Sequence, residues 1–202
     1  NQVFLSAKGC QRCYPGKDTH IPLPDPKNST GKSEIMFINE RPGRIGTGKS
    51  GYVSFDNDDP SANFFKECFE AAGLDRESVF ITNACLCHPI DAGYTDSQPT
   101  VAELTNCHHW LREQIEVVQP SLIVTVGWTA LQSMLRYEGL WPTTGRKTFG
   151  AWVGRTIRTT SPWIYAVAHT SRKGRANRSA ELQVSDWIKI PQILEQANHL
   201  HQ

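Results

Sequence analysis

The chain alternates short apolar runs with longer stretches in which apolar residues recur every three or four positions. Four apolar runs have the length of strands, at 34–39, 79–85, 121–128 and 163–169. Each run is nearly continuous, which is typical of strands buried on both faces of a parallel sheet. The helical spacing predicts helices over 61–74, 100–120, 128–137 and 185–200.

Residues that start and stop helices support these boundaries. Ser61 and Thr100 are candidate N-caps, and Pro120 stands where the second helix ends. Pro191 either starts or interrupts the last helix. Strands and helices alternate without an internal repeat, which indicates an α/β fold. We predict one three-layer α/β/α domain over 1–202, with a central four-stranded, mainly parallel sheet.

Two segments fall outside this alternation. Residues 1–31 are rich in Pro, Gly, Lys and Asp, and this composition is typical of a loop. Its low apolar content predicts that something other than a hydrophobic core ties it down. Residues 147–159 predict a small hairpin or an extended excursion before the last strand.

Composition sets further limits. The chain has 202 residues, of which 39% are hydrophobic and 20% charged, as is ordinary for a soluble globular domain. No apolar run approaches the roughly 18 residues that a membrane span needs. We therefore expect a cytoplasmic, monomeric protein that makes no contact with membranes. A net charge of +1 neither predicts nor excludes binding to nucleic acid, so the local clustering of charge matters more.

Positive charge gathers directly after the last apolar run. Residues 172–178 hold four cations and no acid: Arg172, Lys173, Arg175 and Arg178. A charge run of this kind is often only a solvated loop. Its position after a strand end also suits a contact with phosphate groups.

The stretch GRIGTGKS at 43–50 matches the phosphate-binding pattern G-x-x-x-x-G-K-[ST]. In a working P-loop the Lys-Ser pair opens a helix whose N-terminus faces the phosphates. Here Lys49 and Ser50 are followed by GYVSFDNDDP, which does not predict a helix, and no other strand ends in a carboxylate that could hold magnesium. A nucleoside triphosphatase is therefore a weak alternative.

The carboxyl ends of the four predicted strands bring polar residues to one edge of the sheet. In open parallel sheets the ligand binds beyond this edge. The residues expected there are 39–43, Asn83, Cys85, Cys87, 127–128 and 169–171.

Four of the six cysteines form a candidate metal centre. Cys10 and Cys13 form a C-x-x-C pair in the first segment, and Cys87 and Cys107 lie after the second strand and in the following helix. Four thiolates suit either zinc or a [4Fe-4S] cluster. The alternative is a redox pair with two core cysteines. Further ligands left open are Cys85, His88, His108 and His109.

Several short motifs, in this order and spacing, resemble those of the iron–sulfur (family 4) uracil-DNA glycosylases. The first strand is followed by NERPG (39–43), which is similar to the family's G-E-A-P-G, and SGYVSF (50–55) loosely resembles G-x-P-F-V-G. ITNACLCHP matches I-T-N-x-x-x-C-x-P, IVTVGWTA matches I-V-x-x-G-x-x-A, and HTS (169–171) stands for H-P-S. The resemblance runs from Cys10 to about Ser171, most of the chain.

The resemblance implies a DNA glycosylase that hydrolyses the N-glycosidic bond of a flipped-out pyrimidine. No Lys stands among the candidate residues at the strand ends, so we predict a monofunctional enzyme without lyase chemistry. It implies that Asn83 reads the base, that Tyr52 stacks on it, and that the four candidate cysteines hold a [4Fe-4S] cluster, with zinc as the alternative. The chemistry agrees, because an extruded base is read by hydrogen bonds and stacking. Phe55 is a second candidate for the stacking ring.

Bond cleavage leaves negative charge on the base and positive charge on the sugar. His169 is expected to donate to the base oxygen, and Glu40 to stabilise the sugar or orient the attacking water. Asn39 is expected beside the base. The residues expected to contact DNA are Arg41, Arg44, Lys49, Ser171, Arg172, Lys173, Arg175 and Arg178.

The chain departs from the family pattern where the base would sit. Asn39 replaces a Gly, Arg41 a small Ala and Thr170 a Pro. An alternative substrate is therefore a larger or more polar base than uracil, such as the bulky 5-substituted bases of some phages, and the enzyme would then act in defence rather than repair. A non-catalytic nucleic-acid-binding module built on a metal cluster is the other alternative. The sequence leaves the base, the strand preference and the biological role open.

Overall fold

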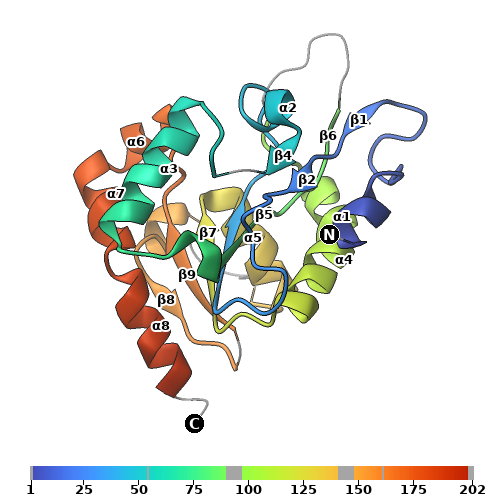
Figure 1. Cartoon of the computed structure of the whole chain (residues 1–202). Coiled ribbons are helices and arrows are strands. Elements are labelled where there is room, and N and C mark those ends of the chain that lie inside the picture. Colours follow the sequence, from blue (N-terminus) through green and yellow to red (C-terminus); the bar gives the residue numbers. More distant parts are fainter. Residues whose placement is uncertain (1, 54, 90–96, 141–147, 161, 200–202) are drawn as a thin grey trace.

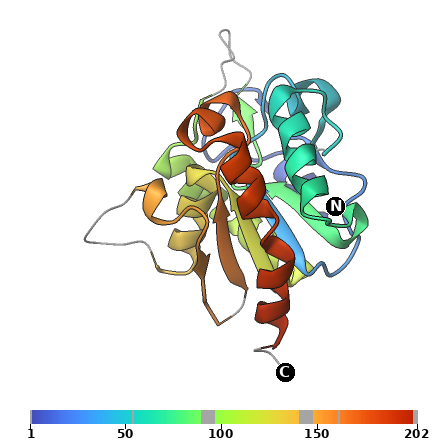
Figure 2. The same ribbon diagram turned by 90° about the vertical axis from the view of Figure 1, so that its left-hand side faces the viewer.

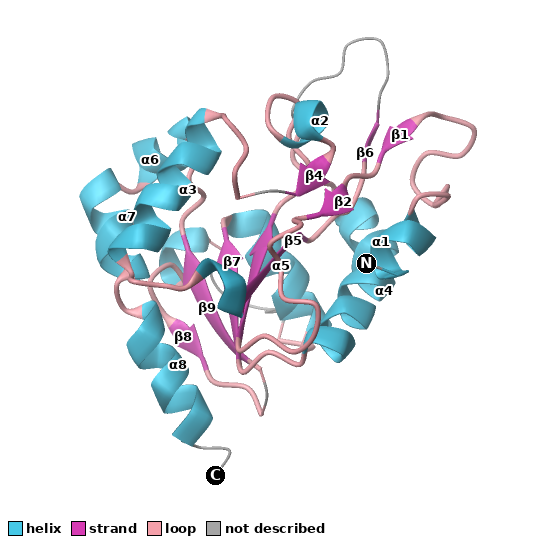
Figure 3. Cartoon of the chain, in the orientation of Figure 1, coloured by secondary structure: helices cyan, strands magenta, loops and turns pink. Residues whose placement is uncertain are grey.

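The computed structural model of the chain describes residues 2–53, 55–89, 97–140, 148–160 and 162–199. A five-stranded sheet forms its centre (Figures 1 and 3). The strands lie in the order β5 (Val79–Asn83), β3 (Ile35–Asn39), β7 (Leu122–Val126), β9 (Trp163–Val167) and β8 (Thr156–Ile157). The first four are parallel, as predicted, whereas β8 pairs antiparallel with β9. The expected four-stranded sheet is thus corrected to five strands, because part of the segment 147–159 adds an edge.

Helices cover both faces of the sheet. On one face α3 (Pro60–Ala71) contacts α7 (Ala180–Trp187), α7 contacts β9, and α8 (Ile190–His199) contacts β7. On the other face α5 (Trp128–Tyr137) contacts β7 and β3, and α4 (Val101–Val118) packs beside it. Figures 1 and 2 show the two helical layers separated by the sheet. The three-layer α/β/α prediction is confirmed.

Aromatic packing fixes which side of each strand faces α3. Phe37 stacks on Trp187 with ring centroids 5.3 Å apart and meets Phe65 of α3 edge-on at 5.5 Å. Side chains alternate along a strand, so Asn39 points to the same side as Phe37. In the parallel register Asn39 is paired with Asn83. The α3 side of the sheet therefore ends in two neighbouring carboxamides.

Helix boundaries follow the capping chemistry, with two corrections. Thr100 caps α4 in a reciprocal capping box with Glu103, as its position predicted. α3 begins one residue before Ser61, because Asp59 is the N-cap and Pro60 occupies the first turn. The expected helix over 185–200 is two helices, α7 and α8, and Pro191 lies in the first turn of α8, which agrees with the predicted alternative that it starts the last helix.

The N-terminal segment is not only a loop. It contains α1 (Gln2–Ala7), whose Phe4 and Ala7 are fully buried and which packs against α4. The expectation that this segment lacks the apolar groups to dock is therefore wrong. The remaining short elements are β1 (Thr19–His20), β2 (Leu23–Pro24), α2 (Thr47–Ser50), β4 (Tyr52–Val53), η1 (Arg76–Ser78), β6 (His88–Pro89), η2 (Phe149–Ala151) and α6 (Arg172–Asn177). Among the described helices, none combines the length and apolarity needed to cross a bilayer.

Candidate active site

A cavity of about 1130 Å³ opens at the carboxyl edge of the parallel strands. Its lining includes the ends of β3, β5, β7 and β9, the start of α3 and the start of α6. The predicted site residues that line it are Asn39, Glu40, Arg41, Phe55, Asn83, His169, Ser171, Arg172, Lys173 and Arg178. The sheet edge thus gathers both predicted catalytic residues and both predicted base-reading carboxamides in one place.

Gly127 forms the floor between the two predicted catalytic side chains. A Cβ built on Gly127 would lie 3.0 Å from Cβ of His169 and 3.4 Å from Oε1 of Glu40. Gly127 has φ 97° and ψ 172°, a conformation that only glycine adopts readily. Glu40 and His169 therefore approach each other across a position where no side chain fits.

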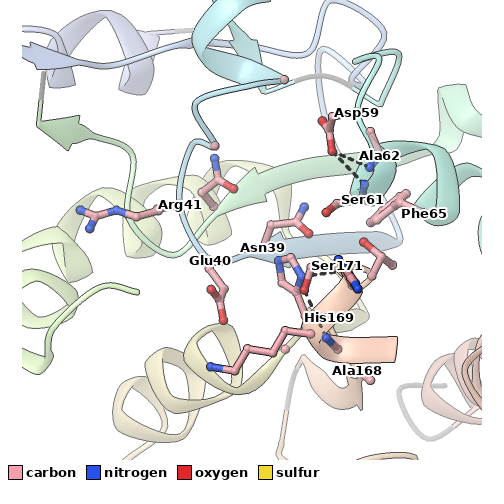
Figure 4. Close-up of a pocket in the computed structure, with 18 of the residues that line it drawn as sticks. Asn39, Glu40, Arg41, Asp59, Ser61, Ala62, Phe65, Ala168, His169 and Ser171 are labelled. Atoms are coloured by element: carbon pink, nitrogen blue, oxygen red, sulfur yellow. Dashed lines mark hydrogen bonds between the residues drawn. The ribbon is translucent and has the colours of Figure 1, made fainter. Parts of the chain in front are cut away.

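The backbone that follows His169 fixes its tautomer. The Ser171 N–H donates to Nδ1 of His169 at 3.0 Å (Figure 4). An Nδ1 that accepts a hydrogen bond leaves the ring proton of the neutral imidazole on Nε2. Burial lowers the pKa of His169 below its usual 6.5, although the charges of Glu40 and Asp59 act in the opposite direction. His169 is thus a neutral donor through Nε2 at physiological pH.

We expect a titration of His169 followed by NMR to give a pKa below 6.5. The Glu40→Gln variant should give a still lower pKa, because removing the carboxylate removes a charge that stabilises the imidazolium. The Ser171 backbone contact persists in this variant, so the tautomer should not change. A pKa above 6.5 in the unaltered protein would contradict the buried, neutral state.

Helix α6 supports His169 from behind. Gly174 lies so close to the carbonyl oxygen of His169 that a Cβ at this position would overlap it. Ser171 caps α6, and its hydroxyl accepts from the Gly174 N–H at 3.3 Å. Ser171 therefore positions His169 and the basic segment together, beyond the DNA contact that was predicted for it.

The half of the cavity on the α3 side has apolar walls and polar corners. Phe55 and Phe65 line it, and their rings meet edge-on with centroids 6.0 Å apart. Asn83 is 97% buried, and its Nδ2 has no hydrogen-bond partner in the part of the chain that the structure describes. A buried unpaired donor carries a penalty that a ligand acceptor would remove. The aromatic walls and the unpaired donor of Asn83 suit the binding of a flat polar ring in this half of the cavity.

The two candidates for the stacking ring have different positions. Phe55 lines the cavity, whereas Tyr52 is 39% exposed on β4 and is not part of the lining. The prediction of Tyr52 as the stacking residue is thus not supported by its place in the fold. SGYVSF resembled the family motif only loosely. Of its two aromatic residues, Phe55 is the one that lines the cavity.

Arg41 requires the clearest correction. It was expected to contact DNA, but its side chain is 5% exposed and forms an ion pair of 2.6 Å with Glu103 of α4. It also donates to the carbonyl oxygen of Cys87 at 3.2 Å, and Tyr14 donates to the same Glu103 carboxylate. Figure 4 shows the Arg41 side chain pointing away from Glu40 and His169. Arg41 thus connects the loop after β3 to α4 and to the segment that carries Cys87.

Replacing Arg41 with Met should lower the free energy of unfolding by about 3 kcal/mol, because Glu103 would stay buried without its cation. Burial alone would raise the pKa of Glu103, but hydrogen bonds from Tyr14, Thr100 and Arg41 lower it to about 2. This stabilisation is present above the ordinary carboxyl pKa of 4.5 and is lost as the pH falls toward 2.

Urea unfolding of the Arg41→Met variant at pH 7 measures the loss. The matched control is Arg112→Met, since Arg112 pairs with Glu116 on the surface, with side chains 67% and 56% exposed. That pair should contribute less than about 1 kcal/mol. Equal losses in the two variants would mean that the Arg41 ion pair does not hold the loop.

The basic segment contains both cations that contact neighbouring helices and cations that are exposed. Arg178 makes two hydrogen bonds to buried Asp186, and Arg175 stacks over Phe64 and donates to the Thr170 carbonyl. Both were predicted to bind DNA, but these contacts hold α6 against α3 and α7. Arg172 and Lys173 are exposed at the rim of the cavity. Of the four cations in this segment, Arg172 and Lys173 therefore remain the candidates for a contact with DNA.

The P-loop-like stretch has the wrong geometry for a phosphate site. Lys49 and Ser50 end the four-residue helix α2 rather than open a helix, and Gly51 closes it with φ 77°. Arg44 and Lys49 are exposed outside the cavity lining, so their predicted DNA contacts stay predictions. Gly46 packs directly on Asn57 and Asp59 of the cavity wall. The stretch is a wall of the cavity.

The predicted metal-binding cysteines gather beside Arg41. Hydrogen bonds from Cys85 and Cys87 lower the pKa of Cys107 to about 3, and the charges of Cys107 and Cys10 act on Cys13. The chemistry of these thiols therefore suits a thiolate-bound centre. Within the described ranges, however, no three His, Cys, Asp or Glu side chains are arranged to hold a metal ion.

Sequence reasoning missed Asn57 and Asp59 in the cavity wall. Both line the cavity, yet in the sequence they belong to a polar turn, SFDNDDP, with no motif. The Asp-Pro pair could have identified Asp59 as a helix cap. Its position opposite the strand ends depends on how α3 packs on the sheet, which no local signal reveals.

Comparison with known proteins agrees with this geometry. A family model described as the uracil DNA glycosylase superfamily matches residues 26–189. The chain is 33% identical over 127 residues to a Type-4 uracil-DNA glycosylase of Saccharolobus solfataricus. This match covers 58% of this chain and 50% of that protein. The identity to the Type-4 uracil-DNA glycosylase of Archaeoglobus fulgidus is 31%, over 65% of this chain and 61% of that protein.

A Type-5 uracil-DNA glycosylase of Pyrobaculum aerophilum is 29% identical over 53% of this chain and 50% of its own length. The matches thus span about half to three fifths of these relatives.

Proposed function

The chain belongs to the uracil-DNA glycosylase superfamily, and from this premise we propose that it is a monofunctional DNA glycosylase. The substrate is a flipped-out pyrimidine, either uracil or a 5-modified base, and the product is an abasic site. The observation that carries the proposal is the approach of Glu40 and His169 across Gly127, beneath a cavity whose buried Asn83 has an unpaired donor.

The base enters the half of the cavity on the α3 side. Phe55 offers an aromatic ring there, and Asn83 offers an amide that can donate to a base acceptor. The neutral His169 donates through Nε2 to a carbonyl oxygen of the base as negative charge develops on it. A neutral donor suits this role, because its hydrogen bond strengthens as the base becomes an anion.

Glu40 acts on the sugar side of the bond. Its carboxylate lies near His169, so both groups can reach the two ends of one glycosidic bond. It stabilises the positive charge that develops on the sugar and orients the attacking water. Arg172 and Lys173 at the rim contact the DNA backbone.

A second candidate substrate is favoured by the size of the cavity. Its volume of about 1130 Å³ exceeds the 300–1,000 Å³ typical of small-molecule pockets, and a pyrimidine ring alone fills little of it. A bulky 5-substituted base of the kind that some phages carry would use this space. The enzyme would then act in defence rather than repair.

The cysteines provide a structural support for the same site. We assign Cys10, Cys13, Cys87 and Cys107 to a [4Fe-4S] cluster, with zinc as the alternative occupant. These cysteines would hold the group, which would join the N-terminal segment to α4 and take no part in bond cleavage. Metal and sulfide analysis of protein purified without oxygen tests this: iron and sulfide in equal amounts support the cluster, and zinc alone contradicts it.

The function is tested by base release from oligonucleotides that carry one uracil or one 5-substituted pyrimidine. Abasic sites are detected by cleavage after alkali treatment. Strands that break without alkali would indicate lyase chemistry and would contradict the monofunctional assignment. Release of no base from folded protein with its metal bound would contradict the proposal and favour a non-catalytic DNA-binding module.

A further inference from the structure

The cavity wall contributed by α3 carries a carboxylate that the proposed reaction does not use. Asp59 caps α3, and its Oδ1 accepts from the Ser61 N–H at 2.9 Å and the Ala62 N–H at 3.1 Å (Figure 4). Its Oδ2 accepts no hydrogen bond from the residues that the structure describes. Asp59 lines the cavity, and its charge acts on His169. One carboxylate oxygen is therefore available to a ligand.

Asn57 places a second acceptor beside it. Its side chain is buried, and Nδ2 donates to Oγ1 of Thr47 and to the carbonyl oxygen of Tyr52, each at 3.4 Å. Because Nδ2 is used in this way, Oδ1 is the atom left for a ligand. Gly46 approaches both side chains: a Cβ there would overlap Oδ2 of Asp59 and lie 3.2 Å from Cβ of Asn57. The two acceptors therefore belong to one corner of the cavity.

The same half of the cavity holds the unpaired donor of Asn83. Asn83 is paired in register with Asn39, whose side of β3 faces α3, and Asp59 begins that helix. Phe65, one and a half turns farther along α3, lines the cavity as well. A ring held between these elements therefore meets acceptors from the α3 side and a donor from the strand end.

We infer that Asp59 and Asn57 bind the exocyclic amino group of the flipped base, so that the enzyme acts on 4-aminopyrimidines, the cytosine class. This inference rests on the proposed glycosylase function and deepens it. A cytosine-type base offers an amino group with two N–H donors, and its neighbouring N3 is an acceptor for Nδ2 of Asn83. A uracil-type base would instead direct its O4 acceptor at the Asp59 carboxylate.

The energetic difference between the two classes comes mainly from Asp59. A hydrogen bond to a charged group is among the stronger kinds, and an acceptor facing a carboxylate leaves both groups without a partner. Sites that hydrogen-bond a substrate group discriminate strongly against analogues that lack it. The wall thus selects by attraction for the amino group and by repulsion of the carbonyl oxygen.

The test compares matched substrates that differ only at position 4 of the ring. Single-turnover release is measured for 5-hydroxymethylcytosine and 5-hydroxymethyluracil in the same oligonucleotide, and likewise for cytosine and uracil. We expect the unaltered protein to release the 4-amino base at least about 10-fold faster in at least one pair. Asp59→Asn keeps a good helix cap but loses the charge, and it should lower release of the 4-amino base by about 10- to 100-fold.

The matched control is Asp58→Asn, because Asp58 is the exposed neighbour of Asp59 and is not part of the cavity lining. Its rates should equal those of the unaltered protein, and thermal unfolding should show that both variants are folded. Faster release of the 4-oxo bases in both pairs, with no effect of Asp59→Asn, would overturn the amino-group site and leave the glycosylase function intact. Release of none of the four bases would overturn both.

Discussion

Replacing Glu40 with Gln is expected to lower the rate of base release by about 10²- to 10⁴-fold while DNA binding remains. Gln keeps the shape of the side chain but cannot stabilise positive charge on the sugar or accept a proton from water. The loss should appear in the single-turnover rate constant, because the carboxylate acts in the transition state rather than in binding. The measurement is release of the preferred base, with affinity followed by fluorescence anisotropy of labelled DNA.

A matched control separates this outcome from the other function classes. Lys49→Ala changes a charged residue of the P-loop-like stretch that lies outside the cavity lining, so release should stay within about 2-fold. A nucleoside triphosphatase would instead depend on Lys49. A non-catalytic binding module would show no base release for Glu40→Gln to diminish. Equal turnover by Glu40→Gln and the unaltered protein would remove Glu40 from the mechanism.

The parallel sheet and the edge that carries the site could be predicted from the sequence. A continuous apolar run in the sequence indicates a strand that is buried on both faces. Such a strand must be covered by helices on both sides, so a local pattern predicts the layers of the fold. Once the strands were known, the carboxyl-end rule brought Glu40, Asn83 and His169 together. Their common cavity follows from topology, so it needed no knowledge of individual side-chain contacts.

The partners of charged residues could not be predicted in the same way. Arg41, Arg175 and Arg178 have the same local sequence pattern as exposed cations, yet each contacts a partner that is distant in sequence or on a neighbouring helix. Glu103 is 62 residues from Arg41 along the chain. A cation in a loop beside a DNA site is therefore a DNA contact only if no buried acceptor lies within reach, and that depends on tertiary packing.

Three glycines show a second limit of sequence reasoning. Gly46, Gly127 and Gly174 lie in unrelated local patterns, but each allows backbone to approach a cavity residue closely. Gly46 belongs to the false P-loop motif, and Gly174 interrupts the basic run. What they share is the absence of a side chain next to Asp59, Glu40 or His169. The arrangement of the cavity residues therefore depends on these glycines as well as on the polar side chains themselves.

The second large effect is therefore expected from Gly127→Ala. The added methyl group would lie 3.0 Å from Cβ of His169 and in contact with Oε1 of Glu40 at 3.4 Å, so His169 has to move away from it by a few tenths of an ångström. A displacement of about 1 Å can lower the rate about 10²-fold, so for this smaller shift we expect single-turnover release to fall by about 10-fold. The φ of 97° adds strain of about 1–3 kcal/mol, which urea unfolding would detect.

Gly139→Ala separates strain from displacement. Gly139 also has a positive φ, 65°, but a Cβ there would meet no atom within 4 Å. This variant should lose about 1 kcal/mol of stability and keep its full rate of base release. If Gly127→Ala loses stability but releases the base as fast as Gly139→Ala, then Glu40 and His169 do not act as a pair across this glycine. If its rate falls at a temperature where both variants are fully folded, the close approach of the two groups is itself the catalytic requirement.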